Sequence, residues 1–527
     1  MTTTSPAPHP GRALLLTFIC VGIFMVYLDA TIVNVALPTM QQKLGADITQ
    51  LQWIVDAYAL VVASLLLTAG TLGDILGRKN IFLGGLIGFV TASALCAVAP
   101  NYTFLLVARI LQGAAGSVMI PISLALISGL FPAPADRAKA VGVWAGVGGL
   151  ALATGPVLGG YLVAQFGWQS IFWVNVPVGA LALSVLIVRL PSAQLPGTRR
   201  PDVAGQLLFI LAISSLAYGL IEASSKGWGS GIILTAFAVA AVALGAFVAW
   251  ESRSADPMLP LGLFRNPVLI VAGTVNFLGL FGLYGSIFLL TLYLQQINGL
   301  STLQAGLRFL SLNVAIMVFS YVASMLAAKF GPKIPIVIGS VASTAGLLQL
   351  TQLQPGTGYG SYWWAMSLIG AGVSLVGAPA TVALLGSVRP EQTGTASGVS
   401  NTFRQVGSVF GVALCGTLLA QHLSSGIPKA VAPLPLEPAQ RAALTNALAK
   451  GDLAAVSHLS PAAREIVLRA AAPVFTDGLH MGAVVAAAAT LVGGLFALFV
   501  LPSRKKPAAA AGVPSAAKDS APQTTTR

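Results

Sequence analysis

Long apolar stretches repeat along the whole chain, and they constrain its fold more than any other feature. Each has the length of about 20 residues that an α-helix needs to cross the hydrocarbon core of a bilayer. Of the 527 residues, 56% are hydrophobic and 8% are charged, whereas soluble domains carry about 25% charged residues. Because a soluble fold could not bury so much apolar surface, the sequence predicts an all-α polytopic membrane protein.

Polar breaks divide these stretches into fourteen expected transmembrane helices. A less hydrophobic segment, 421–478, is expected to form a long outer loop with a surface helix near 462–472. Residues 1–13 precede the first span, and the Ala-, Pro- and Ser-rich residues 502–527 are typical of a disordered tail. The expected spans are approximately 14–37, 51–72, 81–99, 103–127, 140–163, 168–188, 203–222, 231–250, 268–293, 304–328, 334–353, 361–386, 394–420 and 479–501.

The basic residues lie mainly on one side of these helices. With the N-terminus in the cytoplasm, eighteen of the 28 Lys and Arg residues fall in cytoplasmic segments, and only Lys43 and Lys226 fall in short outer loops. Positive charge is retained on the cytoplasmic side, and long loops count little toward orientation. We therefore expect both termini in the cytoplasm. The net charge of +13 is then a topology signal, and no nucleic-acid partner is expected.

Three charged side chains fall inside the expected spans at similar depth. Helix geometry places Asp29 roughly 12 Å, Arg109 roughly 9 Å and Asp56 roughly 8 Å from the outer surface. A carboxylate in hydrocarbon is costly and usually functional. Hydrocarbon favours its neutral form, while a nearby guanidinium favours its ionised form. We expect Asp29 to carry the proton beside Arg109, with Asp56 as a possible helper; a structural ion pair and an interfacial charge are the alternatives.

Several stretches match motifs of one transporter family. They are Leu28–Pro38, Leu51–Trp53, Gly70–Lys79, Arg109 with Gln112 and Gly113, Gly155–Gly160, Trp168–Pro177 and Gly394–Gly407. In these motifs, from about residue 14 to residue 420, the chain resembles the fourteen-span drug/proton antiporters of the major facilitator superfamily, the EmrB/QacA type. The resemblance implies two six-helix bundles, 14–188 and 268–501, with two inserted transmembrane helices at 203–250, in the bacterial cytoplasmic (inner) membrane.

The loop after the second span has a chemistry that can be analysed by itself. Its glycines permit a tight turn, its aspartate can cap a helix N-terminus, and its arginine can pair with a carboxylate or a helix C-terminus. Such a loop is expected to act as a cytoplasmic gate, and the alternative is a basic loop that serves topology alone. Ala328–Lys333 resembles a degraded copy of it in the second half. The expected gate residues are Gly70, Gly73, Asp74, Gly77, Arg78 and Lys79.

The fifth span carries a second glycine motif. Gly155 and Gly159 are four residues apart, so they lie on one helix face and permit close helix contact. Pro156 between them adds a kink point, and Gly160 follows directly. The resemblance implies that this is the antiporter motif, which distinguishes exporters from importers within the superfamily.

The substrate is less constrained by the sequence. From Pro257 to Pro435 the only acidic residue is Glu391, so a preference for doubly charged cations is not expected. A hydrophobic, neutral or singly charged drug-like molecule is the expected substrate. The aromatic residues of the pathway have packing or lipid contact as their alternative role. The expected pathway residues are Asn34, Gln112, Phe281, Tyr284, Asn401 and Arg404.

These expectations predict a secondary antiporter driven by a proton gradient, without cofactor or metal. No Gly-rich loop with Gly-Lys-Ser/Thr is present for ATP. A periplasmic adaptor and an outer-membrane channel are possible partners. One alternative is a proton-coupled importer, or an exporter of a dedicated metabolite, with the same fold. Another is a membrane-embedded enzyme or sensor, but the nucleophile, metal cluster or carboxylate pair that an enzyme needs was not found in the sequence.

Overall fold

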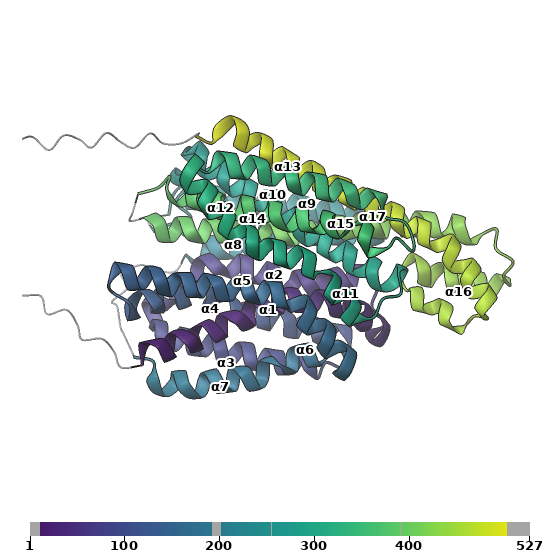
Figure 1. Ribbon diagram of the computed structural model, residues 1–527, viewed down its shortest axis with the longest axis horizontal. Helices are drawn as coiled ribbons and strands as arrows, with labels where there is room; N and C mark the ends of the chain where they lie inside the picture. Colours follow the sequence, from purple (N-terminus) through teal and green to yellow (C-terminus); the bar gives the residue numbers. More distant parts are fainter. Residues whose placement is uncertain (1–10, 192–201, 255, 390–391, 503–527) are drawn as a thin grey trace, which may run out of the picture.

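Long helices make up most of the described chain (Figure 1). The computed structural model describes residues 11–191, 202–254, 256–389 and 392–502, and fourteen helices in this part are long and apolar enough to cross a membrane. The expected all-α polytopic class is thereby confirmed. The expected tail at 502–527 and the segment 1–13 lie almost wholly outside the described residues. Also not described are the side chains or surroundings of Leu67, Gly70, Thr71, Asp74, Pro134, Ala138, Ala454 and Ser457.

The first half of the chain contains seven helices that make six spans. The sixth span, expected as one helix, is interrupted at Val174 and forms the short α6 and the longer α7. Local sequence sets several ends; Asp47, for example, caps α2 in a reciprocal capping box with Gln50. The helices are α1 (Arg12–Leu44), α2 (Ile48–Leu76), α3 (Arg78–Ala97), α4 (Tyr102–Leu130), α5 (Pro134–Phe166), α6 (Ser170–Trp173) and α7 (Asn175–Arg189).

The two inserted helices, α8 (Val203–Lys226) and α9 (Gly231–Glu251), pack on each other, and α8 contacts helices of both halves. The Trp53 ring nitrogen on α2 donates to the Glu222 carboxylate on α8 at 3.0 Å. On the other side, the Thr417 hydroxyl donates to the Leu220 carbonyl at 2.8 Å. The inserted helices are therefore fastened to the first and the second half at once.

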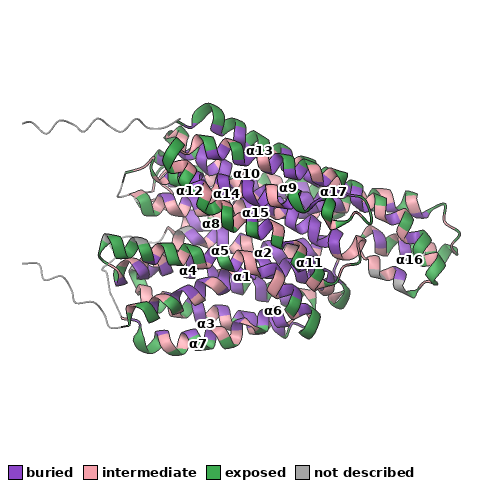
Figure 2. Cartoon of the chain, in the orientation of Figure 1, coloured by how far each residue is buried: buried purple, intermediate pink, exposed green. Residues whose placement is uncertain are grey.

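The second half contains the other six candidate spans. Its helices are η1 (Leu261–Arg265), α10 (Pro267–Leu292), the π-helical turn η2 (Tyr293–Ile297), α11 (Thr302–Arg308), α12 (Leu310–Phe330), α13 (Lys333–Gln349), η3 (Leu350–Gln352), η4 (Tyr359–Ser361), α14 (Trp363–Leu385), α15 (Thr393–Val431), α16 (Pro438–Ala449), η6 (Leu453–His458) and α17 (Pro461–Val500). Large apolar side chains such as Leu181, Val188 and Val242 are exposed on the outer faces, where a bilayer would cover them (Figure 2).

The outer segment 421–478 is more helical than expected. α15 continues to Val431 and α17 begins at Pro461, so the expected surface helix near 462–472 is the first part of the last span. α16 lies between them, at the end of the molecule opposite the start of α1 and the end of α17 (Figure 1). Leu448, Val456 and Val467 are fully buried, and they belong to the same apolar cluster as Ile48 of α2 and Leu423 of α15. We call this the α16 end and the opposite one the terminal end.

The two halves meet at the α16 end. The Gln52 amide on α2 donates to the carbonyls of Val412 (3.2 Å) and Ala413 (2.7 Å) on α15. Similar bonds from side chains of the second half reach α1 and α5: Gln295 to the Val35 carbonyl (2.9 Å), Thr302 to the Gly160 carbonyl (3.1 Å) and Asn313 to the Ala153 carbonyl (2.9 Å). These contacts close the transporter-like bundle at the α16 end.

The part of α5 nearer the terminal end has no such close neighbour. A Cβ atom at Gly142, Gly146 or Gly149 would meet no atom within 4 Å among the described residues. A Cβ atom at Gly160, in contrast, would lie 2.6 Å from the Thr302 carbonyl oxygen of the other half. Only the second part of α5 therefore needs glycine for contact between the halves.

This difference predicts opposite effects for two equal substitutions on α5. Gly160→Ala forces α5 away from α11 and should cost about 1–3 kcal/mol by overpacking. Gly149→Ala meets open space and should stabilise the helix by up to about 1 kcal/mol. Thermal unfolding of the purified variants checks this: the melting temperature should fall for Gly160→Ala and stay level or rise for Gly149→Ala. Equal shifts would contradict the contact between the halves.

Candidate functional site

Close packing of α1, α2 and α4 holds the charged residues of the first half together. A Cβ atom at Gly113 would lie 2.7 Å from the Tyr58 carbonyl oxygen, so glycine is needed for α4 to lie against α2. A Cβ atom at Gly116 would lie 3.2 Å from the Tyr58 hydroxyl oxygen. Gly113 thus allows the face of α4 that carries Arg109 to pack closely against α2.

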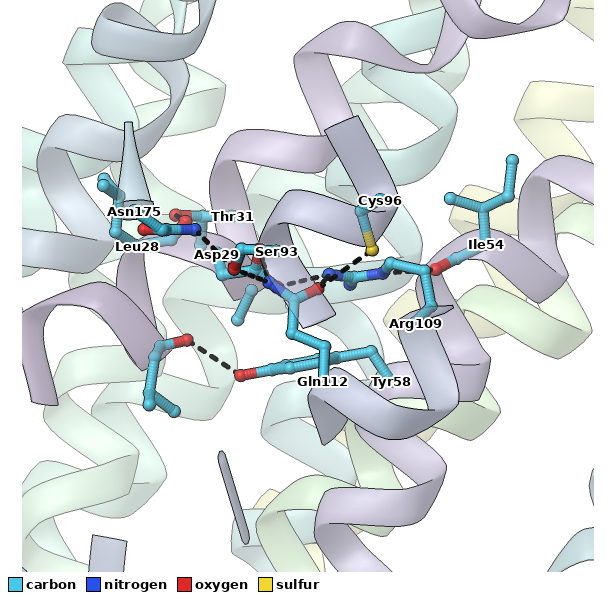
Figure 3. Close-up of polar contacts among 12 residues, drawn as sticks. Leu28, Asp29, Thr31, Ile54, Tyr58, Ser93, Cys96, Arg109, Gln112 and Asn175 are labelled. Carbon is cyan, nitrogen blue, oxygen red and sulfur yellow. Dashed lines mark hydrogen bonds and ion pairs between the residues drawn. The ribbon is translucent and has the colours of Figure 1, made fainter. Parts of the chain in front are cut away.

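Asp29 on α1 and Arg109 on α4 form an ion pair (Figure 3). Asp29 is 0% exposed and Arg109 is 1% exposed. One carboxylate oxygen accepts from the Arg109 Nη1, and the other accepts from the Gln112 amide nitrogen at 2.9 Å. Both oxygens of Asp29 therefore have partners, and the structure brings together two of the three charges expected at this depth.

Gln112 holds the pair from one side. Its amide oxygen accepts from the Arg109 Nη1 at 2.7 Å, and its amide nitrogen also donates to the Ser93 hydroxyl at 2.8 Å. The Asn175 amide reaches the same hydroxyl at 3.3 Å. Gln112, expected in the substrate pathway, lies inside the ion-pair network and is 0% exposed; its contact with substrate stays a prediction.

The rest of the Arg109 side chain is also occupied. Its Nε donates to the Ile54 carbonyl at 3.2 Å. Its guanidinium carbon lies 4.4 Å from the centre of the Tyr58 ring, a cation–π contact, and Tyr58 in turn donates to the Val26 carbonyl at 3.1 Å. The guanidinium is therefore held by α1, α2 and its own helix, and removal of the Asp29 charge would leave it buried without a counter-charge.

Asp56 lies near the pair but outside its hydrogen-bond network. It is 0% exposed, and neither carboxylate oxygen has a hydrogen-bond partner among the described residues. With Arg109 and Tyr284 it lines a cavity of about 20 Å³. The other polar side chains of the lining are Tyr58 of α2 and Gln405 and Ser408 of α15. A plain interfacial charge, one of the two alternatives from the sequence, does not fit this burial. The cavity is large enough for about one water molecule.

The expected gate residues lie where α2 turns into α3. Gly77 alone joins the two helices with a φ of 90°, a conformation that favours glycine. Gly73 lies directly against Ile122 of α4, and Lys79 donates to the Ile187 carbonyl in the last turn of α7 at 3.2 Å. Arg78 begins α3. Gly70 and Asp74 belong to the residues whose surroundings are not described.

The antiporter-motif residues lie along the contacts of α5. Gly155 and Gly159 face Thr31 and Ile32 of α1, and Gly160 faces Thr302 of the second half. The Pro156 carbonyl lies against Gly306 of α11. The motif thus contacts both α1, two residues from Asp29, and the opposite half.

The remaining pathway residues are spread over the centre of the bundle. Asn34 is buried and donates within α1, and Phe281 is buried in the core, while Tyr284 lines the small cavity with Asp56. Asn401 donates to the Ser397 carbonyl of its own helix at 3.1 Å. Arg404 is half-buried, within electrostatic range of the hydroxyls of Tyr27 and Tyr284. Their contact with substrate stays a prediction.

The sequence did not single out Ser93, Gln405 or Ser408. A serine is common in membrane helices and carries no spacing signal, so nothing pointed to Ser93. Gln405 belongs to a quoted motif, Gly394–Gly407, but its side-chain direction toward Asp56 depends on how two distant helices meet. Among the described residues, no group of three His, Cys, Asp or Glu side chains could hold a metal ion.

A family model described as Major Facilitator Superfamily matches residues 19–412. The chain belongs to this superfamily. It is 35% identical over 489 residues to the tetracenomycin C resistance and export protein of Streptomyces glaucescens, covering 91% of this chain and 90% of the relative. It is 36% identical to the multidrug resistance protein Stp of Mycobacterium tuberculosis, covering 83% and 81%. The methylenomycin A resistance protein of Streptomyces coelicolor is 35% identical, with 79% and 88% covered.

Solved structures of the same fold include a bacterial homolog of the human lysosomal transporter Spinster, with a TM-score of 0.65. It covers 94% of this chain and 97% of its own at 16% identity. A D-xylose–proton symporter has a TM-score of 0.55 at 15% identity, with 76% and 89% covered. At such identities the likeness shows the fold alone.

A double-variant series tests whether the ion pair stabilises this arrangement. Arg109→Gln removes the counter-charge of Asp29 and should destabilise the protein by about 3–5 kcal/mol, the usual effect of breaking a buried pair. Adding Asp29→Asn removes the stranded carboxylate, so the double variant should regain much of the loss. Melting temperatures of the wild type, both single variants and the double variant form the cycle. Additive losses would mean that the two side chains do not interact.

Proposed function

We propose that this superfamily member exports hydrophobic drug-like molecules in exchange for protons. The buried pair of Asp29 and Arg109, with both carboxylate oxygens engaged, is the observation that carries the proposal. The relatives named for tetracenomycin C export and for multidrug resistance support the substrate class. Since Glu391 is the only acidic residue from Pro257 to Pro435, the expected substrate is uncharged or singly charged.

In this mechanism Asp29 exchanges the proton and Arg109 responds to it. Ionised Asp29 attracts the guanidinium and joins α1 to α4. A proton on Asp29 removes that attraction, and it leaves the Arg109 charge buried and uncompensated. The guanidinium of Arg109 is then expected to shift toward the cavity that it lines with Asp56 and Tyr284. Since α5 contacts α1 beside Asp29 and the second half through Gly160, the change at the pair can reach the contact between the halves.

Asp56 carries the second part of the proposal. An ionised carboxylate without partners is very costly in a buried site. We therefore assign Asp56 the neutral form in this state, beside the cavity that Arg109 lines. A displaced guanidinium would give Asp56 a counter-charge and favour loss of its proton. Asp29 and Asp56 would then alternate as the partner of Arg109.

The direction of transport follows from the expected topology. If the termini are cytoplasmic, the closed α16 end faces outward and the structure represents a state closed to the outside. The proton gradient supplies the energy, so we assign neither cofactor nor enzymatic activity. The membrane is proposed to be the bacterial cytoplasmic one. The periplasmic adaptor and outer-membrane channel stay predictions, which co-purification from membranes tests.

Efflux driven by a pH gradient tests the role of Asp29. Asp29→Asn keeps the shape of the side chain but cannot exchange a proton, so uptake of a substrate dye into inverted vesicles should fall at least tenfold. Asp136→Asn, on an exposed residue in the first turn of α5, is the matched control and should behave as wild type. Full activity of Asp29→Asn would contradict the proposed proton coupling through Asp29.

Asp56→Asn separates the two carboxyl groups. Because Asp56 is proposed to be neutral in this state, its replacement by a neutral isostere should leave the melting temperature nearly unchanged. Coupled transport should nevertheless fall, since the second proton position is lost. A large drop in melting temperature for Asp56→Asn would show instead that its charge stabilises the fold.

A further inference from the structure

A large apolar cavity lies on the flank of the molecule, away from the polar site. It has a volume of about 790 Å³ and is enclosed by α8, α9, η1, α10 and α15. Small-molecule sites in proteins commonly measure about 300–1,000 Å³. Seven phenylalanines line it, among them Phe209, Phe247, Phe277 and Phe410. The two inserted helices thus form one wall of a cavity that has the size and the aromatic lining of a ligand site.

The lining carries one polar side chain and no charge. Thr402 of α15 is that side chain, and its hydroxyl is buried without a hydrogen-bond partner among the described residues. A buried hydroxyl without a partner is unfavourable. An aromatic molecule that accepts one hydrogen bond would pack against the phenylalanines and would give the Thr402 hydroxyl a partner. Charged molecules are disfavoured, because no side chain in the lining could compensate their charge.

The cavity opens toward the outer face of the bundle. Ala241, Leu244 and Val248 of α9 line it and are also exposed. Such outer faces are the ones that a bilayer would cover, so a ligand can arrive from the hydrocarbon. A lipid chain could enter by the same route, but an acyl chain has no atom that accepts the hydrogen bond of Thr402.

The cavity is separated from the proposed proton site by one helix. Phe403, Val406 and Phe410 of α15 line the flank cavity, whereas Gln405 and Ser408 of the same helix line the small cavity with Asp56. A ligand in the flank cavity therefore contacts the helix that also faces the Arg109 site.

We propose that the flank cavity binds uncharged aromatic molecules with a hydrogen-bond acceptor, taken up from the membrane through the mouth beside Ala241. As the entry site for exported substrate, it rests on the proposed efflux function; as a binding site it stands by itself. Thr402 selects for the acceptor group, and the phenylalanines bind the aromatic surface.

Photolabelling with benzophenone tests the site. Benzophenone is an uncharged aromatic ketone, and on irradiation it attaches to nearby C–H bonds that mass spectrometry can locate. The full-length protein in lipid nanodiscs should be labelled on peptides of α8, α9, α10 and α15 around the cavity. Ala241→Trp fills the mouth and should reduce this labelling at least threefold. Val242→Trp, on the neighbouring residue of the same helix, which is 72% exposed, should leave it unchanged.

Substitutions of Thr402 provide a second test, which does not fill the cavity. Thr402→Val removes only the hydroxyl and should reduce labelling at least threefold, whereas Thr402→Ser should retain it. Labelling that both Ala241→Trp and Thr402→Val leave unchanged would overturn the site. A phosphatidylcholine with a diazirine in its acyl chain supplies the lipid comparison: benzophenone should displace it from these peptides, and failure to do so would assign the cavity to lipid.

Photolabelling needs no pH gradient, so it tests binding independently of transport. Asp29→Asn should keep wild-type labelling while it loses efflux. Labelling at the cavity in a protein that transports nothing would overturn the efflux function and leave the binding site standing. Efflux with no labelling at the cavity would overturn the binding site and leave the efflux function standing.

Discussion

The buried pair of Asp29 and Arg109 is the interaction on which the rest of the polar centre depends. A guanidinium this deep is tolerated because α1, α2 and α4 surround it with a carboxylate, an amide, a carbonyl and an aromatic ring. The carboxylate, the amide and the carbonyl would each be costly to bury without a partner. The pair therefore fixes how the three helices pack, and a change in the charge of either member changes the packing that all three share.

Glycines turn that local arrangement into a contact between the halves. Gly155 and Gly159 bring α5 against α1 beside Asp29, and Gly160 brings the same helix against α11. The side-chain-to-carbonyl bonds between the halves described above lie at the α16 end, whereas the first part of α5 is open. α5 thus contacts both α1, beside Asp29, and the second half. Alternating access requires such a connection between the ion pair and the contact between the halves.

The sequence was sufficient for the fold class and for the Asp29–Arg109 pair. Apolar length and the placement of basic residues follow directly from the physics of the bilayer, so the fourteen spans could be counted. Depth along a helix likewise placed the charges at one level, because the rise per residue is fixed. The contacts of Gln112 with Asp29 and Arg109, and the helices of the outer segment, could not be predicted in this way. Side-chain direction within a bundle depends on helix rotation and tilt, and the core around Leu448 depends on contacts between distant segments.

The contact between Gln52 and Gly416 has a consequence for the evolution of homologous sequences. The Gln52 amide reaches the backbone of α15 where Gly416 carries no side chain, and a Cβ atom there would lie 2.5 Å from the amide nitrogen. Neither residue can therefore be exchanged without regard to the other. Among homologous sequences the two positions should covary, with a larger residue at the second appearing where the first has become short. An evolutionary record of that kind would report on the contact between the halves that this structure shows.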